Sequence, residues 1–189
     1  ALPIWKILLV ISNFSSKERK VNILNKYQDY NKQVLLNNYF DLNEKTLKPY
    51  LEDLKKLPDI SNYDEIHIVA CGSAMYAGMI GKSLFEEYAN IKVVCEIASE
   101  YRYKKVFYSP KTLVIVISQS GETADSLASL RRAKEIGVKT LGIVNVFGSS
   151  IGREADMVIY TNASIEIAVA TTKAFMMQVY ILGLIAIKN

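Results

Sequence analysis

After residue 65, short apolar runs alternate with longer stretches of helical character, and this rhythm restricts the possible folds more than any other feature. The expected strands are Ile66–Cys71, Ile91–Ile97, Thr112–Ile117, Thr140–Val144 and Met157–Tyr160. The expected helices are Ala74–Tyr88, a stretch from Glu122 to Ile136, and Thr171–Ile187. Strands that alternate with helices pair in parallel, and the helices cover both faces of the sheet. The pattern therefore predicts an α/β protein, a three-layer α/β/α sandwich around a five-stranded parallel sheet.

The first third of the chain differs in composition from the rest. All nine glycines lie at or after Gly72, whereas eight of the twelve asparagines precede residue 66. This change predicts an N-terminal segment over residues 1–65 and a domain over residues 66–189. Within the segment, Leu42–Leu57 is the clearest helix candidate. The first ~20 residues show no pattern that indicates a structure, and a fragment boundary explains them better than a signal peptide.

Composition and charge exclude several classes of partner. The chain has 189 residues, of which 50% are hydrophobic, and a net charge of +4, which suits one globular domain. No basic run carries interleaved aromatic residues, so no nucleic acid is expected. The longest apolar stretch, Ala174–Ile187, contains Gln178 and is too short to span a membrane. We therefore expect no membrane partner and a cytoplasmic protein.

The cysteines and the single histidine do not form a recognisable metal site. Cys71 and Cys95 each lie in an apolar, strand-like run, which favours buried, reduced thiols. His67 lies in the same run as Cys71 and has no second histidine to accompany it. The sequence therefore predicts no metal ion.

Ser118–Thr123 is the candidate binding segment. It follows the apolar run Leu113–Ile117 and precedes a helix, so three hydroxyls and a glycine meet a helix N-terminus, where unpaired N–H groups favour an anion. The segment has no Lys or Arg, so backbone amides and hydroxyls would hold a phosphate on a small molecule. The alternative is that Ser118 or Ser120 only caps the helix, which is worth about 1 kcal/mol.

Other motifs either fail or lie at the same edge of the sheet. Gly81-Lys82-Ser83 lacks the earlier glycine of a P-loop, and no dinucleotide or nucleophile-elbow motif is present. Gly72-Ser73 follows the first strand, and Glu166–Lys173 joins the fifth strand to the last helix. Because ligands of such folds bind beyond the carboxyl ends of the strands, both segments are expected near the Ser118–Thr123 site.

Several blocks together closely resemble the sugar-isomerase (SIS) domain of the glutamine–fructose-6-phosphate aminotransferases, which are glucosamine-6-phosphate synthases. They are Cys71-Gly72-Ser73, Glu96–Tyr103, Ser118–Asp125, Asn145-Val146, Gly148–Ser150, Thr161–Ala163 and Thr171–Phe175. The resemblance runs from about residue 66 to 189 and corresponds to the first of the family's two SIS domains. It implies a flavodoxin-like SIS fold.

The resemblance also implies a substrate and its binding residues. Ser118, Gln119, Ser120 and Thr123 match the family's phosphate binders, and Ser73 and Val169 match sugar-contacting positions, Val169 through its backbone. Ala74 stands where the family often has a serine, which would remove a hydroxyl contact. The expected partner is a hexose phosphate, fructose 6-phosphate or glucosamine 6-phosphate.

The family's full enzyme contains more than this chain. Ammonia from an N-terminal glutaminase domain passes to fructose 6-phosphate, which is isomerised to glucosamine 6-phosphate without a cofactor. The family's catalytic residues belong to the second SIS half, so we expect no catalytic residue here and no activity of this chain alone. Because Ala174–Ile187 is apolar nearly all round, a lone domain would expose a patch there, and we expect that second half or a second subunit of a homo-oligomer to cover it.

Two other functions remain open on the sequence. A sugar-phosphate-sensing SIS module of a transcriptional regulator would carry a helix-turn-helix before the domain, and the glycine-free first third shows no such signature. A single-domain aldose–ketose phosphosugar isomerase would need its own base and histidine near the phosphate site. His67, inside a strand before that edge, is poorly placed for this role.

Overall fold

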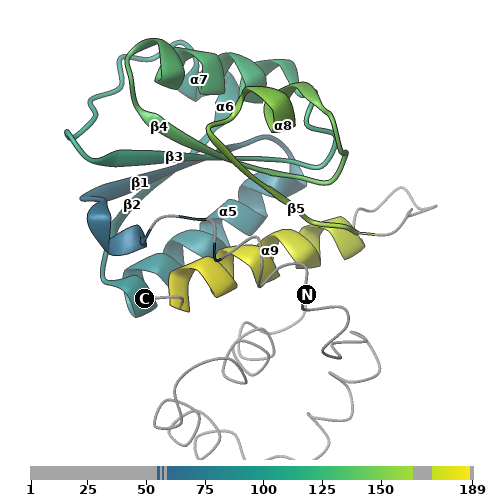
Figure 1. Cartoon of the computed structure of the whole chain (residues 1–189), viewed down its shortest axis with the longest axis horizontal. Coiled ribbons are helices and arrows are strands. Elements are labelled where there is room, and N and C mark those ends of the chain that lie inside the picture. The colour runs from purple at the N-terminus through teal and green to yellow at the C-terminus, as the bar shows by residue number, and fades with distance from the viewer. Residues whose placement is uncertain (1–54, 56, 58, 164–171, 188–189) are drawn as a thin grey trace, which may run out of the picture.

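A five-stranded, wholly parallel sheet forms the centre of the protein in the computed structural model, which describes residues 55, 57, 59–163 and 172–187. The strands are β1 (Glu65–Ala70), β2 (Lys92–Ile97), β3 (Thr112–Ser118), β4 (Lys139–Val144) and β5 (Met157–Tyr160), in the order β2-β1-β3-β4-β5. The predicted α/β/α sandwich with five parallel strands is confirmed (Figure 1).

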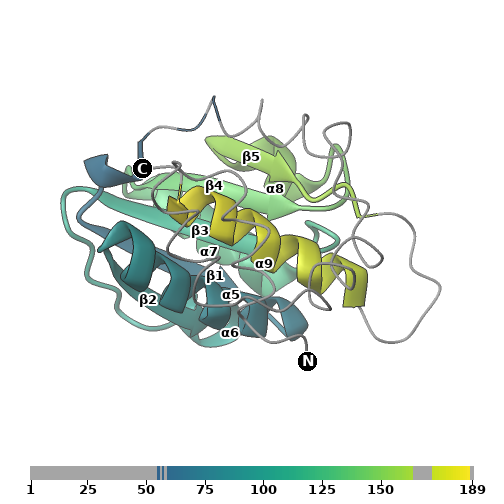
Figure 2. The same cartoon turned by 90° about the horizontal axis from the view of Figure 1, so that it is seen from below.

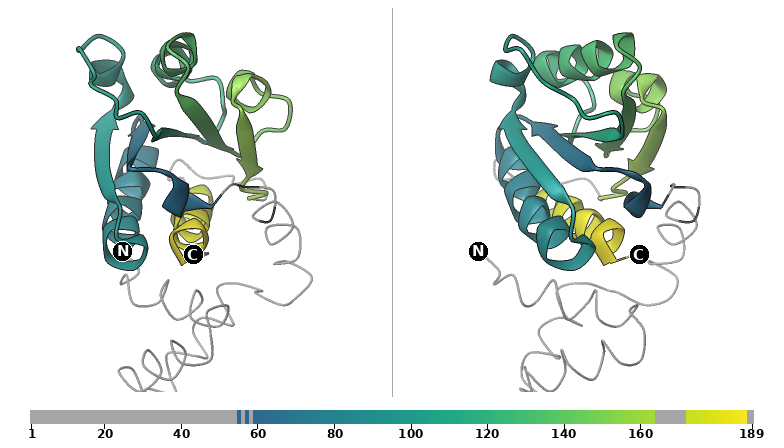
Figure 3. Two further views of the ribbon diagram at one scale, coloured as in Figure 1. Left: turned by 60° about the vertical axis from the view of Figure 1, so that its left-hand side comes forward. Right: turned by 90° about the vertical axis from the view of Figure 1, so that its left-hand side faces the viewer.

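The helices form one layer on each side of the sheet. They are α5 (Ser73–Leu84), α6 (Ala98–Tyr101), α7 (Ala124–Glu135), α8 (Ser150–Glu154) and α9 (Thr172–Ile187), with short helical turns at η1 (Ile60–Asn62) and η2 (Phe85–Ala89). α6, α7 and α8 cover one face, and α5 and α9 cover the other (Figure 1). The side views show the sheet between these two layers (Figure 3).

The alternation of side chains along each central strand explains this layering. β1 and β3 are buried at every position. On β3, Ile115 and Ile117 pack in the core beneath α5 and α9, whereas Val114 and Val116 pack with Leu130 of α7. Because successive side chains of a strand point to opposite faces, a continuous apolar run is what a strand covered on both sides requires.

Small residues on α5 allow α9 to approach closely. A Cβ atom at Gly81 would lie 2.7 Å from Leu182 Cδ1, and one at Gly78 would lie 2.8 Å from Ile68 Cγ2. The small residues of this helix therefore contact both the sheet and α9. From below, α5 and α9 run side by side (Figure 2).

The order of the strands places a crevice between β1 and β3. The chain passes from β1 to β2 on one side and then crosses to β3 on the other side of β1. At their carboxyl ends, Ala70 of β1 is in register with Ile117 of β3. Ligands of open parallel sheets bind at such a reversal of strand order.

Some elements differ from the prediction. The helix expected to reach Tyr88 ends at Leu84 and continues as the π-helical turn η2. α6 and α8 were not predicted, because four or five residues are too few to show helical periodicity. The expected helix Leu42–Leu57 lies almost wholly outside the described residues.

The expected exposed patch on the last helix does not occur. All residues from Gln178 to Ala186 are buried, and Tyr180, Leu184 and Ile185 belong to the main core. The apolar character of α9 therefore goes with its burial against the main core. Within the part of the chain that is described, no helix is both long and apolar enough to cross a membrane.

Candidate functional site

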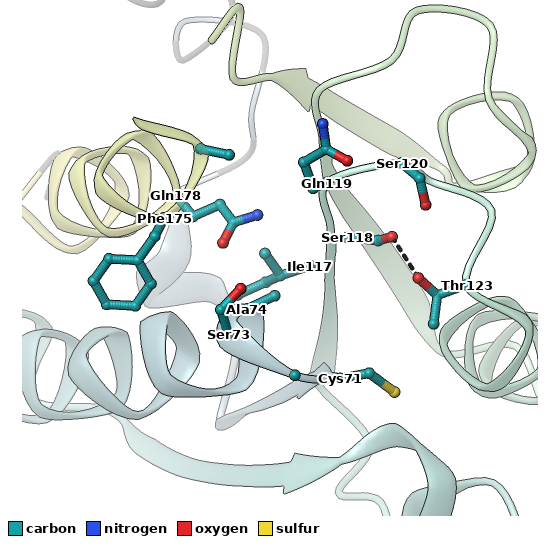
Figure 4. A pocket seen from close by; sticks show the side chains of 12 residues that line it. Cys71, Ser73, Ala74, Ile117, Ser118, Gln119, Ser120, Thr123, Phe175 and Gln178 are labelled. Atoms are coloured by element: carbon teal, nitrogen blue, oxygen red, sulfur yellow. Dashed lines mark hydrogen bonds between the residues drawn. The ribbon is translucent and has the colours of Figure 1, made fainter. Parts of the chain in front are cut away.

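A pocket of about 290 Å³ opens at the carboxyl ends of β1 and β3, where the strand order reverses. Three segments line it: Cys71–Ala74 after β1, Ile117–Ser120 with Thr123 at and beyond the end of β3, and Ala174, Phe175 and Gln178 of α9. Figure 4 shows these side chains around the opening. The structure thus brings together five of the six predicted site residues. The sixth, Val169, lies outside the described residues.

The segment from Ser118 to Thr123 is ordered by its own hydroxyls. The N–H of Gly121 donates to Ser118 Oγ at 3.0 Å, and Ser118 Oγ lies 2.9 Å from Thr123 Oγ1. The N–H of Glu122 donates to Ser120 Oγ at 3.2 Å. These bonds hold the loop in a tight curve around the pocket, which we call the hydroxyl cradle (Ser118, Gln119, Ser120 and Thr123).

The capping alternative for Ser118 and Ser120 is wrong. Thr123 is the N-cap residue of α7, and no side-chain hydrogen bond caps this helix end. The Thr123 hydroxyl bonds to Ser118 instead of turning back to the first helical turn. Since the first N–H groups of a helix have no intrahelical partner, this end of α7 keeps its capacity to bind an acceptor oxygen.

Contacts from outside the loop fix the shape of the hydroxyl cradle. Gly121 has φ 68° and lies so close to the start of α8 that a Cβ atom there would be 2.1 Å from Ser149 Oγ. The N–H of Ser150 donates to Glu122 Oε1 at 2.7 Å, and this bond lowers the pKa of the Glu122 carboxyl. The N–H of Ile151 donates to the Gly121 carbonyl at 3.0 Å. The loop after β3 is therefore braced against α8.

The loop after β1 forms the second wall. Gly72, the N-cap residue of α5, has φ 57° and ψ −136°, a backbone conformation that side chains disfavour. Ser73 is exposed beside the pocket, and Ala74 is buried with 6% of its surface accessible. Because Ala74 has no hydroxyl, Ser73 is the residue of this loop that contributes a side-chain hydroxyl to the pocket.

The third wall contains a residue that the sequence reasoning did not assign to the site. Gln178 lines the pocket from α9 and is only 2% exposed, and its Oε1 has no hydrogen-bond partner among the described residues. Its one sequence signal was that a polar residue interrupts a helix that is otherwise almost wholly apolar.

The described side chains that line the pocket carry no formal charge. None of the described lining residues is Lys, Arg, His, Asp or Glu. Asp125, in the first turn of α7, is paired with Arg102 at 2.6 Å. An anion would therefore be held by hydroxyls and backbone amides, as the sequence predicted, and general acid–base chemistry would need residues outside this lining.

His67 lies away from the pocket, in a buried polar cluster on the α6 and α7 side of β1. Its Nδ1 is 2.9 Å from Tyr101 Oη and its Nε2 is 3.2 Å from Glu65 Oε1. Burial lowers the pKa of His67, although Glu65 opposes the shift. Burial also opposes ionisation of Glu65, but hydrogen bonds from Lys92, Ser109 and Thr112 lower its pKa to about 2.

The two cysteines are free. Both are half-buried, whereas the sequence predicted buried thiols. Cys71 lines the pocket, and Cys95 lies near Gly78 of α5. Burial raises the pKa of the Cys95 thiol to about 11.

Comparison with known proteins now defines the class. The SIS domain family matches residues 59–188, so the chain belongs to the SIS domain family. The matched range includes all three walls of the pocket.

Its relatives within that class are glutamine–fructose-6-phosphate aminotransferases (isomerizing). The chain is 51% identical over 144 residues to the one from Clostridium acetobutylicum, which covers 71% of this chain and 24% of that protein. It is 52% identical over 124 residues to the one from Clostridium tetani, which covers 66% of this chain and 20% of that protein. The chain thus spans between a fifth and a quarter of the length of these relatives.

A solved structure agrees with both results. The C-terminal domain of glucosamine–fructose-6-phosphate aminotransferase from Francisella tularensis superposes with a TM-score of 0.65 at 37% identity. The match covers 74% of this chain and 46% of that one. The resemblance to this aminotransferase family and the SIS fold, both expected from the sequence, are confirmed.

Proposed function

We propose that this protein binds a hexose phosphate, fructose 6-phosphate, as the first SIS half of a glutamine-dependent, glucosamine-6-phosphate-forming aminotransferase. The observation that carries the proposal is the hydroxyl cradle, because three hydroxyls and an uncapped helix N-terminus converge on a neutral pocket at the reversal of strand order. The names of the relatives, which include fructose 6-phosphate, support this choice of sugar.

Each cradle residue has a role in this proposal. Ser118, Gln119, Ser120 and Thr123 bind the phosphate oxygens through their N–H and O–H donors, and the hydrogen bond between Ser118 and Thr123 is exchanged for one to the ligand. Hydrogen bonds to a charged group contribute about 1.5–3 kcal/mol each, so several of them can hold a phosphate without a cationic side chain. Ser73 and the backbone of Val169 contact the sugar.

The same proposal assigns no catalysis to this chain alone. Proton transfer and imine formation need a carboxylate, a histidine or a lysine at the substrate, and none is among the described lining residues. We therefore propose that those groups come from a second SIS half or another subunit of a homo-oligomer in the cytoplasm, and that residues 66–189 form the binding domain. The same absence weighs against a self-sufficient isomerase.

A calorimetric titration tests the binding role. Fructose 6-phosphate is titrated into the wild-type chain and into the Ser120→Ala/Thr123→Ala variant, with Ser83→Ala on the exposed side of α5 as the matched control. Loss of one charged hydrogen bond of about 1.5 kcal/mol weakens affinity by roughly tenfold, so the double variant should lose at least that much. Equal affinity of the double variant and wild type would refute the cradle.

A further inference from the structure

Gln178 is a polar side chain placed where an apolar one would be expected. It lies on α9 among buried residues such as Val179 and Ile181, and it is 2% exposed. Within the part of the chain that the structure describes, its Oε1 has no hydrogen-bond partner. Buried side-chain acceptors in folded proteins nearly always have a partner, so an unpaired one in a pocket wall points to a ligand group as its partner.

The direction of the side chain identifies where that group binds. Gln178 projects from α9 into the pocket toward Ile117 (Figure 4). It approaches from the wall opposite the loop that carries Ser118, Ser120 and Thr123. A ligand whose anionic end occupies the hydroxyl cradle would therefore present its other end to the carboxamide.

We propose that Gln178 is a specificity-determining residue, whose carboxamide hydrogen-bonds hydroxyl groups of the sugar portion of the ligand. A carboxamide has both donors and acceptors, and a half-turn of its terminal amide exchanges them. It therefore matches a hydroxyl, which both donates and accepts. This inference rests on the proposed function and adds to it the group that distinguishes a polyhydroxylated phosphate ester from phosphate alone.

If Gln178 binds the ligand, replacing it should affect the stability of the fold and the affinity for the ligand in opposite directions. An unpaired buried acceptor destabilises the unliganded fold, and an apolar side chain of the same length removes that penalty. Methionine has this shape. Gln178→Met should therefore keep or raise the midpoint temperature of unfolding while weakening sugar-phosphate binding, whereas a purely structural glutamine would lower that temperature when replaced.

The test uses the full 189-residue chain and two ligands, fructose 6-phosphate and inorganic phosphate. Gln178→Met should bind fructose 6-phosphate about tenfold more weakly, because one hydrogen bond is lost and a ligand hydroxyl is left unpaired. Its affinity for inorganic phosphate should change less than twofold. Met177→Leu, a neighbour on α9 that packs on the core, is the control and should bind both ligands as the wild type does.

Each outcome decides between the two proposals. Unchanged fructose 6-phosphate affinity in Gln178→Met overturns the role of Gln178 and leaves the proposed function intact. Equal losses for both ligands together with a lower unfolding temperature assign Gln178 to packing and also overturn the inference. A wild-type chain that binds inorganic phosphate but binds fructose 6-phosphate no more tightly overturns the proposed sugar and, with it, the inference.

Discussion

Replacing Gly121 by alanine should strongly destabilise the protein, because two separate costs act at this position. Its φ of 68° lies in the left-handed region, which costs an alanine about 1–2 kcal/mol. The added Cβ would also lie 2.1 Å from Ser149 Oγ and 2.5 Å from Ser149 Cβ, so atoms must move. Forcing extra volume into a packed site costs about 1–3 kcal/mol. We expect a total loss of about 2–5 kcal/mol in urea unfolding.

Two matched variants separate these costs. Gly137 has φ 79° and no atom within 4 Å of an added Cβ, so Gly137→Ala should show the backbone cost of about 1–2 kcal/mol alone. Gly121→Ala/Ser149→Gly removes the clashing side chain and should recover about 1–3 kcal/mol relative to Gly121→Ala. A loss in Gly121→Ala no larger than that in Gly137→Ala, or no recovery with Ser149→Gly, would contradict this division of the free-energy cost.

Two further predictions concern the titratable groups. Because burial lowers the pKa of His67, the unfolded chain binds a proton at this residue more readily than the folded chain does. The contribution of His67 to stability is therefore complete above the unfolded pKa of about 6.5 and declines as pH falls below it. His67→Gln should flatten the slope of unfolding free energy against pH between pH 7 and 5, and parallel slopes in both proteins would contradict this. The raised pKa of Cys95, about 11 against 9.0, leaves roughly 100-fold less thiolate at pH 8. Iodoacetamide should therefore label Cys95 far more slowly in the native Cys71→Ser variant than in the same variant unfolded in urea, and similar rates would contradict the raised pKa.

The elements that sequence patterns predicted best are those whose local sequence is sufficient to define them. The run Leu113–Ile117 is too apolar for any place but the centre of a covered sheet, and it became part of β3, buried at every position. Its position also identified the start of the binding loop, since ligand sites follow strand ends in this architecture. These predictions needed no knowledge of distant contacts.

The features that were missed depend on residues far apart in the chain. The contact between Gly121 and Ser149 spans 28 positions and gives the loop its shape, yet neither residue reveals the other. Gln178 and Ser118 line the same pocket only because α9 packs against the sheet beside α5. The alternative that Ser118 or Ser120 only caps α7 fails because the Ser118 hydroxyl bonds to Thr123, which the pattern of hydroxyls cannot show.

The most direct measurement is a crystal structure of this chain with fructose 6-phosphate bound. The account predicts phosphate oxygens within hydrogen-bond distance of the hydroxyls of Ser118, Ser120 and Thr123, with the sugar directed toward Ser73 and Gln178. A phosphate held elsewhere, or a sugar in the pocket with its phosphate turned away from the Ser118–Thr123 loop, would contradict it.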